Sequence, residues 1–347
     1  MSGIGWFFLL LGVVSVLLAG GWVGLHRRDR EGEHVLEAEP EDRPLAAVVV
    51  NPVKVDESVH REIEAVCTGL GWAPPLWLTT TPEDTGTGQA KAAIERGADV
   101  VIACGGDGTV RSVAQALARS GVAMGLVPAG TGNLLAGTLG LPTEVTAATR
   151  IALTGDDRLI DVGRLFADDA NERVFLVMAG TGLDAVIMES TPEGLKGRVG
   201  PLAYVISGFR AVRGRRARVT IAMDDGDPVR RSTRMVLVGN TGSLGGGFAL
   251  MPDAAVDDGK LDVVSLAPKG LLGWVAVATR VATRNHRGSR RIEHWQARNV
   301  TVTSDAPQSA QVDGDLIGEV REMRICVDAG ALLVRVPSGT GSQQRPR

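Results

Sequence analysis

The sequence predicts an α/β nucleotide-binding domain followed by a β-rich sandwich domain, preceded by one transmembrane helix. Three observations lead to this fold class. Apolar runs alternate with helical stretches in residues 44–160, which is typical of a parallel sheet covered by helices. Short strand-like runs separated by Gly, Asp and Pro fill residues 161–337, which favours a sandwich or barrel. An uncharged apolar segment, residues 4–25, stands at the start of the sequence.

The apolar segment has the length and composition of a membrane-spanning helix. Ile4 to Leu25 carries no charge, and about 20 apolar residues suffice to cross a bilayer. No basic residue precedes the run and no clear small-x-small cleavage site follows it, so an anchor is favoured over a secretory signal peptide. Arg27, Arg28 and Arg30 come directly after it. Because positive charge collects on the cytoplasmic side, we expect a single-pass membrane protein whose catalytic domains are cytoplasmic.

Polar segments flank the predicted globular region. Residues 26–43 are acidic and show no hydrophobic period, which predicts a solvated linker. Residues 338–347 are polar and are expected to be disordered. The folded part is therefore expected within residues 44–337.

Charge and residue usage exclude several classes of protein. The chain has 37 basic and 40 acidic residues, a net charge of -3, which is too near neutral for a nucleic-acid-binding domain. Its 3 cysteines are an odd number, far apart and in apolar stretches, so neither a disulfide framework nor a zinc spacing is present. The 5 histidines are scattered among polar residues, which argues against a histidine metal site or a Ser-His dyad.

Four apolar runs in residues 44–160 predict buried strands, and helical stretches separate them. The predicted strands are Leu45–Val50, Leu76–Thr80, Asp99–Ala103 and Ala123–Val127. The predicted helices are 57–70, 88–96, 110–119 and 134–139. This alternation indicates a parallel sheet with helices on both faces, which binds its ligands at the carboxyl ends of the strands.

Residues 161–337 show a different pattern, with short apolar runs and few helical stretches. The predicted strands are Val174–Met178, Arg218–Met223, Thr233–Gly239, Leu261–Leu266, Asn299–Val302 and Met323–Val327. Gly, Asp and Pro turns separate them, so we expect a β-rich sandwich or barrel with inserted helices.

The most informative motif is a Gly-Gly-Asp-Gly-Thr loop between a predicted strand and a predicted helix. Glycine lets the backbone approach a ligand closely, and the following helix N-terminus offers unpaired amides to phosphate. A carboxylate in such a cradle repels phosphate unless a divalent cation intervenes, so the Asp is expected to reach Mg²⁺ of a nucleotide directly or through water. The alternative is a glycine turn whose Asp and Thr cap the helix. The loop consists of Gly105, Gly106, Asp107, Gly108 and Thr109.

A second glycine loop follows the next predicted strand. Gly130-Thr131-Gly132-Asn133 precedes the helical stretch from Leu134, and parallel neighbouring strands would bring the two loops together. Thr131 and Asn133 could then bind phosphate or ribose oxygens, whereas their alternative role is to cap the helix.

The two loops do not belong to the commonest nucleotide sites. The sequence contains neither a Walker Gly-x-x-x-x-Gly-Lys-Ser/Thr motif nor a dinucleotide fingerprint with its downstream acid. Its ordered motifs instead resemble the diacylglycerol kinase catalytic family, which includes bacterial diacylglycerol kinases, sphingosine kinases and ceramide kinases. The resemblance covers Leu45 to Pro337. It rests on both glycine loops and on Asn51-Pro52, Asp257 to Leu261 and Val312 to Asp315.

The resemblance implies an α/β nucleotide domain and a β-sandwich with the active site between them. It implies that Gly105 to Thr109 bind ATP phosphates and that Asn51 and Thr80 line the nucleotide site. It also implies that Asp313 is the general base and that Asp258 holds a structural Mg²⁺. A carboxylate that accepts the proton of the attacking hydroxyl is what phosphoryl transfer requires, although Asp-Gly is also an ordinary hairpin-turn dipeptide.

The chain departs from the family pattern at several positions. Asn51 to Val55 stands where the family often reads Asn-Pro-x-Ser-Gly. Ser112 replaces a Glu found in many members, Leu134 replaces an Asp common in bacterial diacylglycerol kinases, and Asp315 replaces the Glu of Asp-Gly-Glu. These departures affect the expected acceptor more than the expected reaction.

Three functions remain open from the sequence. The first is an ATP- and Mg²⁺-dependent lipid kinase that converts diacylglycerol to phosphatidic acid or phosphorylates a sphingoid base, ceramide or related lipid. Its partners would be the membrane lipid and the bilayer, with a homodimer also compatible and no nucleic acid. The second is an NAD kinase, which shares the Gly-Gly-Asp-Gly-Thr loop. The third is a catalytically idle, membrane-tethered nucleotide or lipid sensor, against which the retained Asp107 and Asp313 argue.

Overall fold

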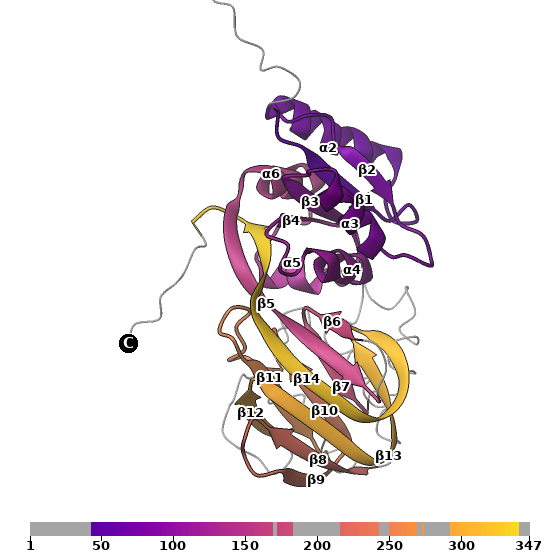
Figure 1. Ribbon diagram of the computed structural model, residues 1–347, viewed down its shortest axis with the longest axis vertical. Helices are drawn as coiled ribbons and strands as arrows, with labels where there is room; N and C mark the ends of the chain where they lie inside the picture. Colours follow the sequence, from indigo (N-terminus) through magenta and orange to yellow (C-terminus); the bar gives the residue numbers. More distant parts are fainter. Residues whose placement is uncertain are drawn as a thin grey trace, which may run out of the picture. The chain divides into compact units, whose positions relative to one another are not determined.

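A computed structural model describes residues 43–168, 172–182, 216–242, 250–268, 273 and 292–339. The described residues from Pro44 onward belong to one compact unit. In it, an α/β half is followed by a β-rich half (Figure 1).

Four parallel strands form the sheet of the α/β half, as predicted. Their order is β2-β1-β3-β4. All residues of β1, β3 and β4 are buried, which is expected of strands covered on both faces. The bounds are β1 Ala46–Val50, β2 Leu76–Thr79, β3 Val100–Gly105 and β4 Ala123–Pro128.

Helices cover both faces of this sheet. Helices α2 and α6 share one buried cluster with β1 and β3, and α3, α4 and α5 share another. Figure 1 shows these two groups of helices on opposite faces of the sheet. Helix α6 was missed by the sequence analysis. Asp56 starts α2 by accepting hydrogen bonds from the backbone N–H groups of Ser58 and Val59. The bounds are α2 Glu57–Gly69, α3 Thr87–Glu95, α4 Asp107–Leu117, α5 Leu134–Thr138 and α6 Val145–Thr154.

The β-rich half consists of antiparallel strands that continue from the same sheet. Their bounds are β5 Asp156–Ala167, β6 Arg173–Phe175, β7 Met178–Thr181, β8 Ala217–Met223, β9 Val229–Thr233, β10 Met235–Gly239, β11 Leu261–Leu266, β12 Ile292–Ala297, β13 Asn299–Val312 and β14 Asp315–Val336. Long strand β14 pairs antiparallel with β5 and β13 and reaches β4 in parallel at Val334 and Met124. One strand therefore belongs to both halves.

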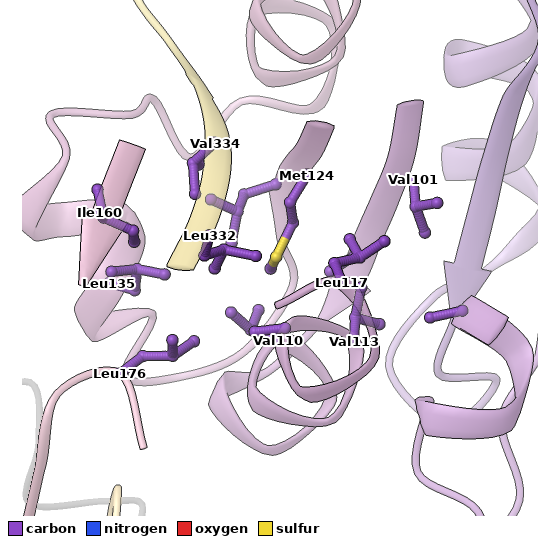
Figure 2. Packing of buried hydrophobic residues seen from close by; sticks show 14 of the residues in the cluster. Val101, Val110, Val113, Leu117, Met124, Leu135, Ile160, Leu176, Leu332 and Val334 are labelled. Carbon is purple, nitrogen blue, oxygen red and sulfur yellow. The ribbon is translucent and has the colours of Figure 1, made fainter. Parts of the chain in front are cut away.

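The core where the halves meet is apolar. Figure 2 shows Val110 and Leu117 of α4 with Met124 of β4 and with Leu332 and Val334 of β14. Of these five side chains, none is more than 7% exposed. Burial of this size favours a fixed arrangement of α4 and β14, because each such side chain contributes about 1.5–3 kcal/mol.

The predicted membrane localisation is corrected by the structure. Among the helices in the described ranges, none is long and apolar enough to cross a membrane. The segment on which the prediction rested, residues 4–25, lies outside the described residues, as do the predicted linker up to residue 42 and most of the predicted tail.

Candidate active site

The two glycine loops lie together at the carboxyl ends of β3 and β4. The backbone N–H of Ala129 donates to the carbonyl of Gly105 over 2.9 Å. A Cβ added to Gly130 would lie 2.6 Å from the Cα of Gly106. Only glycine at position 130 allows this approach, since real Cβ atoms do not come so close to a backbone atom. The juxtaposition predicted from strand order is therefore present.

The first loop is shorter than predicted because α4 begins at Asp107 rather than near Val110. Asp107, Gly108 and Thr109 thus form the first turn of the helix. The N-cap residue Gly106 has no side chain, so it supplies no side-chain cap to the first backbone N–H groups of α4. A helix N-terminus of this kind attracts anions.

Asp107 holds the second loop in place. Its Oδ2 accepts from the N–H of Asn133 over 3.0 Å, and its Oδ1 accepts from the N–H of Leu134 over 2.8 Å. Asn133 has a positive φ of 47°. Its side chain closes the turn, because Oδ1 accepts from the N–H of Gly130 over 2.9 Å and Nδ2 donates to the carbonyl of Gly130 over 2.8 Å. Direct ligation of Mg²⁺ by Asp107 would compete with these bonds. Thr131, by contrast, is exposed at the tip of the loop.

The two other predicted nucleotide residues also follow strands of this sheet. Asn51 follows β1, where its Oδ1 accepts from Val53 N–H over 3.0 Å and its own N–H donates to Cys104. Thr80 follows β2, is 7% exposed and donates its N–H to Val50 over 2.9 Å. Both residues therefore lie at the edge where the glycine loops lie, with Asn51 shaping its own turn.

The side chain of Ser112, a departure from the family pattern, has hydrogen-bond partners inside the fold. Its hydroxyl donates to the carbonyl of Gly108 over 3.0 Å and lies 2.6 Å from the hydroxyl of Thr85. The residue is 8% exposed. A carboxylate would be costly to bury in this setting, so the shorter Ser suits the packing of α4.

The predicted general base, Asp313, lies in a two-residue hairpin turn between β13 and β14. Asp313 and Gly314 both have positive φ, 46° and 92°, as a type I′ turn requires. The Asp313 carboxylate accepts hydrogen bonds from three backbone N–H groups, each at 2.9 Å. They belong to Leu176 and Val177, in the break between β6 and β7, and to Met178, the first residue of β7. This break interrupts the strand that the sequence predicted over Val174–Met178.

The same carboxyl is buried. Asp313 is 9% exposed, and burial raises the pKa of its carboxyl while the three N–H donors oppose the rise. The three backbone N–H groups occupy most of the positions at which this carboxylate can accept hydrogen bonds. The geometry therefore favours a role for Asp313 in holding the turn.

Asp315, two residues further, faces the first glycine loop. A Cβ added to Gly108 would lie 3.7 Å from its Oδ2. Arg111 of α4 donates to this Oδ2 over 2.5 Å and to the carbonyl of Val312 over 2.9 Å. The Asp315 side chain is 61% exposed, so it remains open to a ligand. The sequence signal was the Asp-Gly-Asp motif itself, but the motif does not tell which carboxylate faces the loop.

Asp258 belongs to an acidic cluster away from the glycine loops. Burial raises the pKa of Asp161, and the charges of Asp258 and Asp257 raise it further. Both carboxylate oxygens of Asp161 accept backbone N–H groups, from Gly259 at 2.7 Å and Gly330 at 2.8 Å. These bonds tie the predicted Asp258 loop to β5 and β14.

Comparison with known proteins identifies the class. Residues 46–165 match the diacylglycerol kinase catalytic domain, and residues 177–335 match the YegS C-terminal NAD kinase beta sandwich-like domain. With its paired glycine loops and facing carboxylate, the chain is a kinase, a transferase with an alcohol group as acceptor. It belongs to the diacylglycerol kinase catalytic family, and a kinase of this family uses ATP.

Individual relatives agree with this assignment. A protein named diacylglycerol kinase from Staphylococcus saprophyticus is 29% identical over 284 residues, which covers 80% of this chain and 91% of the relative. The diacylglycerol kinase of Staphylococcus aureus strain MRSA252 is 27% identical over 283 residues, covering 80% and 88%. The fold matches a crystal structure described as a diacylglycerol kinase from Bacillus anthracis with a TM-score of 0.69 and 21% sequence identity, covering 86% of this chain and 98% of that one.

The close approach of the glycine loops predicts a large effect of one added methyl group. Gly130→Ala is expected to weaken ATP binding roughly tenfold or more, about 1.4 kcal/mol, because the new Cβ meets the Cα of Gly106 at 2.6 Å and Oδ1 of Asn133 at 2.8 Å. Isothermal titration with ATP measures the change. Gly137→Ala in α5 is the matched control, since nothing lies within 4 Å of its added Cβ. Equal affinity in the two variants would contradict the prediction.

A pH effect is expected from Asp262. Burial raises the pKa of its carboxyl to about 6, with Asp258 and Asp253 adding to the rise and Gln296 and Lys260 opposing it. The pKa of the Asp262 carboxyl in the fold lies above its ordinary value of 3.8, so the stabilisation is complete below about pH 4 and is lost as pH rises through about 6.

Asp262→Asn should remove this dependence. Between about pH 4 and pH 7 the unfolding free energy of the wild type should fall by about 2–3 kcal/mol relative to that of the variant. Urea denaturation of both proteins in EDTA, at several pH values, measures the difference. Parallel pH profiles would show that the Asp262 carboxyl is not perturbed.

Proposed function

We propose that this chain transfers the γ-phosphoryl group of ATP to a hydroxyl of diacylglycerol, giving phosphatidic acid. The observation that carries the proposal is the approach of Asp315 to Gly108, which brings a carboxylate of the β-rich half to the phosphate loop of the α/β half. The relatives named diacylglycerol kinase support the choice of acceptor.

The proposed reaction is an in-line displacement. The diacylglycerol hydroxyl oxygen attacks the γ-phosphorus, the bond from that phosphorus to the β,γ-bridging oxygen breaks, and ADP leaves. Asp315 accepts the hydroxyl proton as the P–O bond forms. Arg111 orients Asp315 through its hydrogen bond of 2.5 Å. Asp313 serves to hold the turn that presents Asp315.

The nucleotide residues are assigned to the edge of the parallel sheet. Backbone N–H groups of the two glycine loops and of the first turn of α4 bind the phosphates. Thr131 adds a hydroxyl to this set, and Asn51 and Thr80 flank the nucleotide. Asp107 keeps the loops in register through the N–H groups of Asn133 and Leu134.

Mg²⁺ is proposed as the second cofactor. When bound, it neutralises phosphate charge. Asp107 would contact the nucleotide-bound ion through water, because its oxygens bind the second loop. At the acidic cluster, the described residues include no group of three or more His, Cys, Asp or Glu arranged as a metal site. The resemblance implies that Asp258 would hold an ion there with backbone carbonyls and water, the hard oxygen ligands that Mg²⁺ prefers.

The test uses the full chain with γ-labelled ATP and Mg²⁺. Mixed micelles offer diacylglycerol, sphingosine, ceramide and phosphatidylglycerol separately, beside NAD in solution. Label in phosphatidic acid supports the proposal. Label in another lipid would change the acceptor, label in NADP would indicate an NAD kinase, and no transfer to any acceptor would favour a nucleotide or lipid sensor.

A further inference from the structure

Lys54 lies beside the two glycine loops. Its backbone N–H donates to the Asn51 carbonyl over 3.0 Å, which closes the turn after β1. A Cβ added to Gly106 would lie 3.8 Å from the Nζ of Lys54 and 3.5 Å from the Cα of Gly130. The ammonium group therefore lies next to the point where the loops meet.

The charge of Lys54 is not neutralised by the protein. Among the ion pairs of the residues that the structure describes, none includes Lys54. The nearest loop carboxylate, that of Asp107, accepts its hydrogen bonds from the N–H groups of Asn133 and Leu134. An unpaired ammonium thus lies next to Gly106, the N-cap residue of α4, which has no side-chain cap. Together they favour a polyvalent anion.

We propose that Lys54 binds a phosphate group of the nucleotide, and this inference rests on the proposed function in taking ATP as the ligand. Lys54 occupies the position of Ser in the Asn-Pro-x-Ser-Gly loop that the family often carries. A lysine supplies a mobile positive charge where that loop has a small neutral side chain. The ammonium group lies 3.8 Å from the place that a Cβ at residue 106 would take, so it can reach phosphates bound at this loop.

The substitution Lys54→Ala is expected to weaken ATP binding about 10- to 100-fold, as the loss of a hydrogen bond to a charged group does. The loss should shrink from ATP to ADP to AMP and vanish for adenosine. Lys54→Arg should restore most of the affinity, since it keeps the charge. Lys91→Ala on α3 is the matched control, because Lys91 is an exposed lysine outside both glycine loops.

Isothermal titration of the full-length variants with ATP, ADP, AMP and adenosine, without any lipid, measures these affinities, and circular dichroism checks folding. An ATP affinity unchanged in Lys54→Ala, or an equal loss for ATP and adenosine, would overturn the phosphate contact. A wild type that binds ATP with this Lys54 dependence but labels no lipid would support the contact and overturn the acceptor. A wild type that binds no ATP would overturn both.

Discussion

Asp315→Asn is expected to lower kcat for lipid phosphorylation by about 10²–10⁴-fold while leaving ATP affinity within about threefold. The amide keeps the size of the side chain and an oxygen for the hydrogen bond from Arg111, but it has no basic oxygen to accept the hydroxyl proton. Initial rates with γ-labelled ATP and diacylglycerol micelles give kcat, and titration with ATP gives the affinity.

Two further variants make the result decisive. Asp225→Asn, in the exposed turn between β8 and β9, controls for the loss of one negative charge and should keep full activity. Asp313→Asn separates the two carboxylates of the Asp-Gly-Asp turn. If Asp315→Asn stays active while a folded Asp313→Asn is inactive, Asp313 is the base, as the sequence resemblance implies.

Asp313→Ala is expected to reduce the unfolding free energy by about 3 kcal/mol or more. It removes the acceptor for the buried N–H groups of Leu176, Val177 and Met178, and an unsatisfied buried donor costs about 1–3 kcal/mol. It also places Ala at a φ of 46°, which Asp tolerates better. Urea denaturation followed by circular dichroism measures the loss.

Asp315→Ala is the matched control for stability. It changes the same hairpin, but the Asp315 carboxylate is 61% exposed and pairs with Arg111, and an exposed ion pair contributes about 0–1 kcal/mol. We therefore expect a stability loss below about 1 kcal/mol for Asp315→Ala. A stability loss of the same size in both variants would show that the three amides do not depend on Asp313.

Much of the fold follows from local pattern. Buried apolar runs such as Val100 to Cys104 fix the parallel strands, because a strand covered on both faces must be apolar along its whole length. Amphipathic spacing gives α2 and α4, although α4 begins at Asp107, since glycine and aspartate at a helix start do not reveal which residue is the N-cap.

Other elements depend on contacts distant in sequence. Strand β5 was not predicted, and of the 22 residues of β14 only Met323–Val327 was predicted as a strand. Their exposed and polar positions alternate irregularly, and they become strands because they pair with each other over most of their length. β-Structure of this kind is decided by partners rather than by intrinsic preference.

The sequence by itself determined the family, the two glycine loops and the Asp-Gly-Asp turn, because spacing along the chain sets which strand ends carry them. Only the tertiary structure shows what each carboxylate contacts. Asp313 and Asp315 belong to one type I′ hairpin, but one is directed to the buried amides of the β6–β7 break and the other to Gly108. The break, α4 and the hairpin are far apart in sequence, so only their packing shows which carboxylate is buried against backbone amides and which faces the first glycine loop.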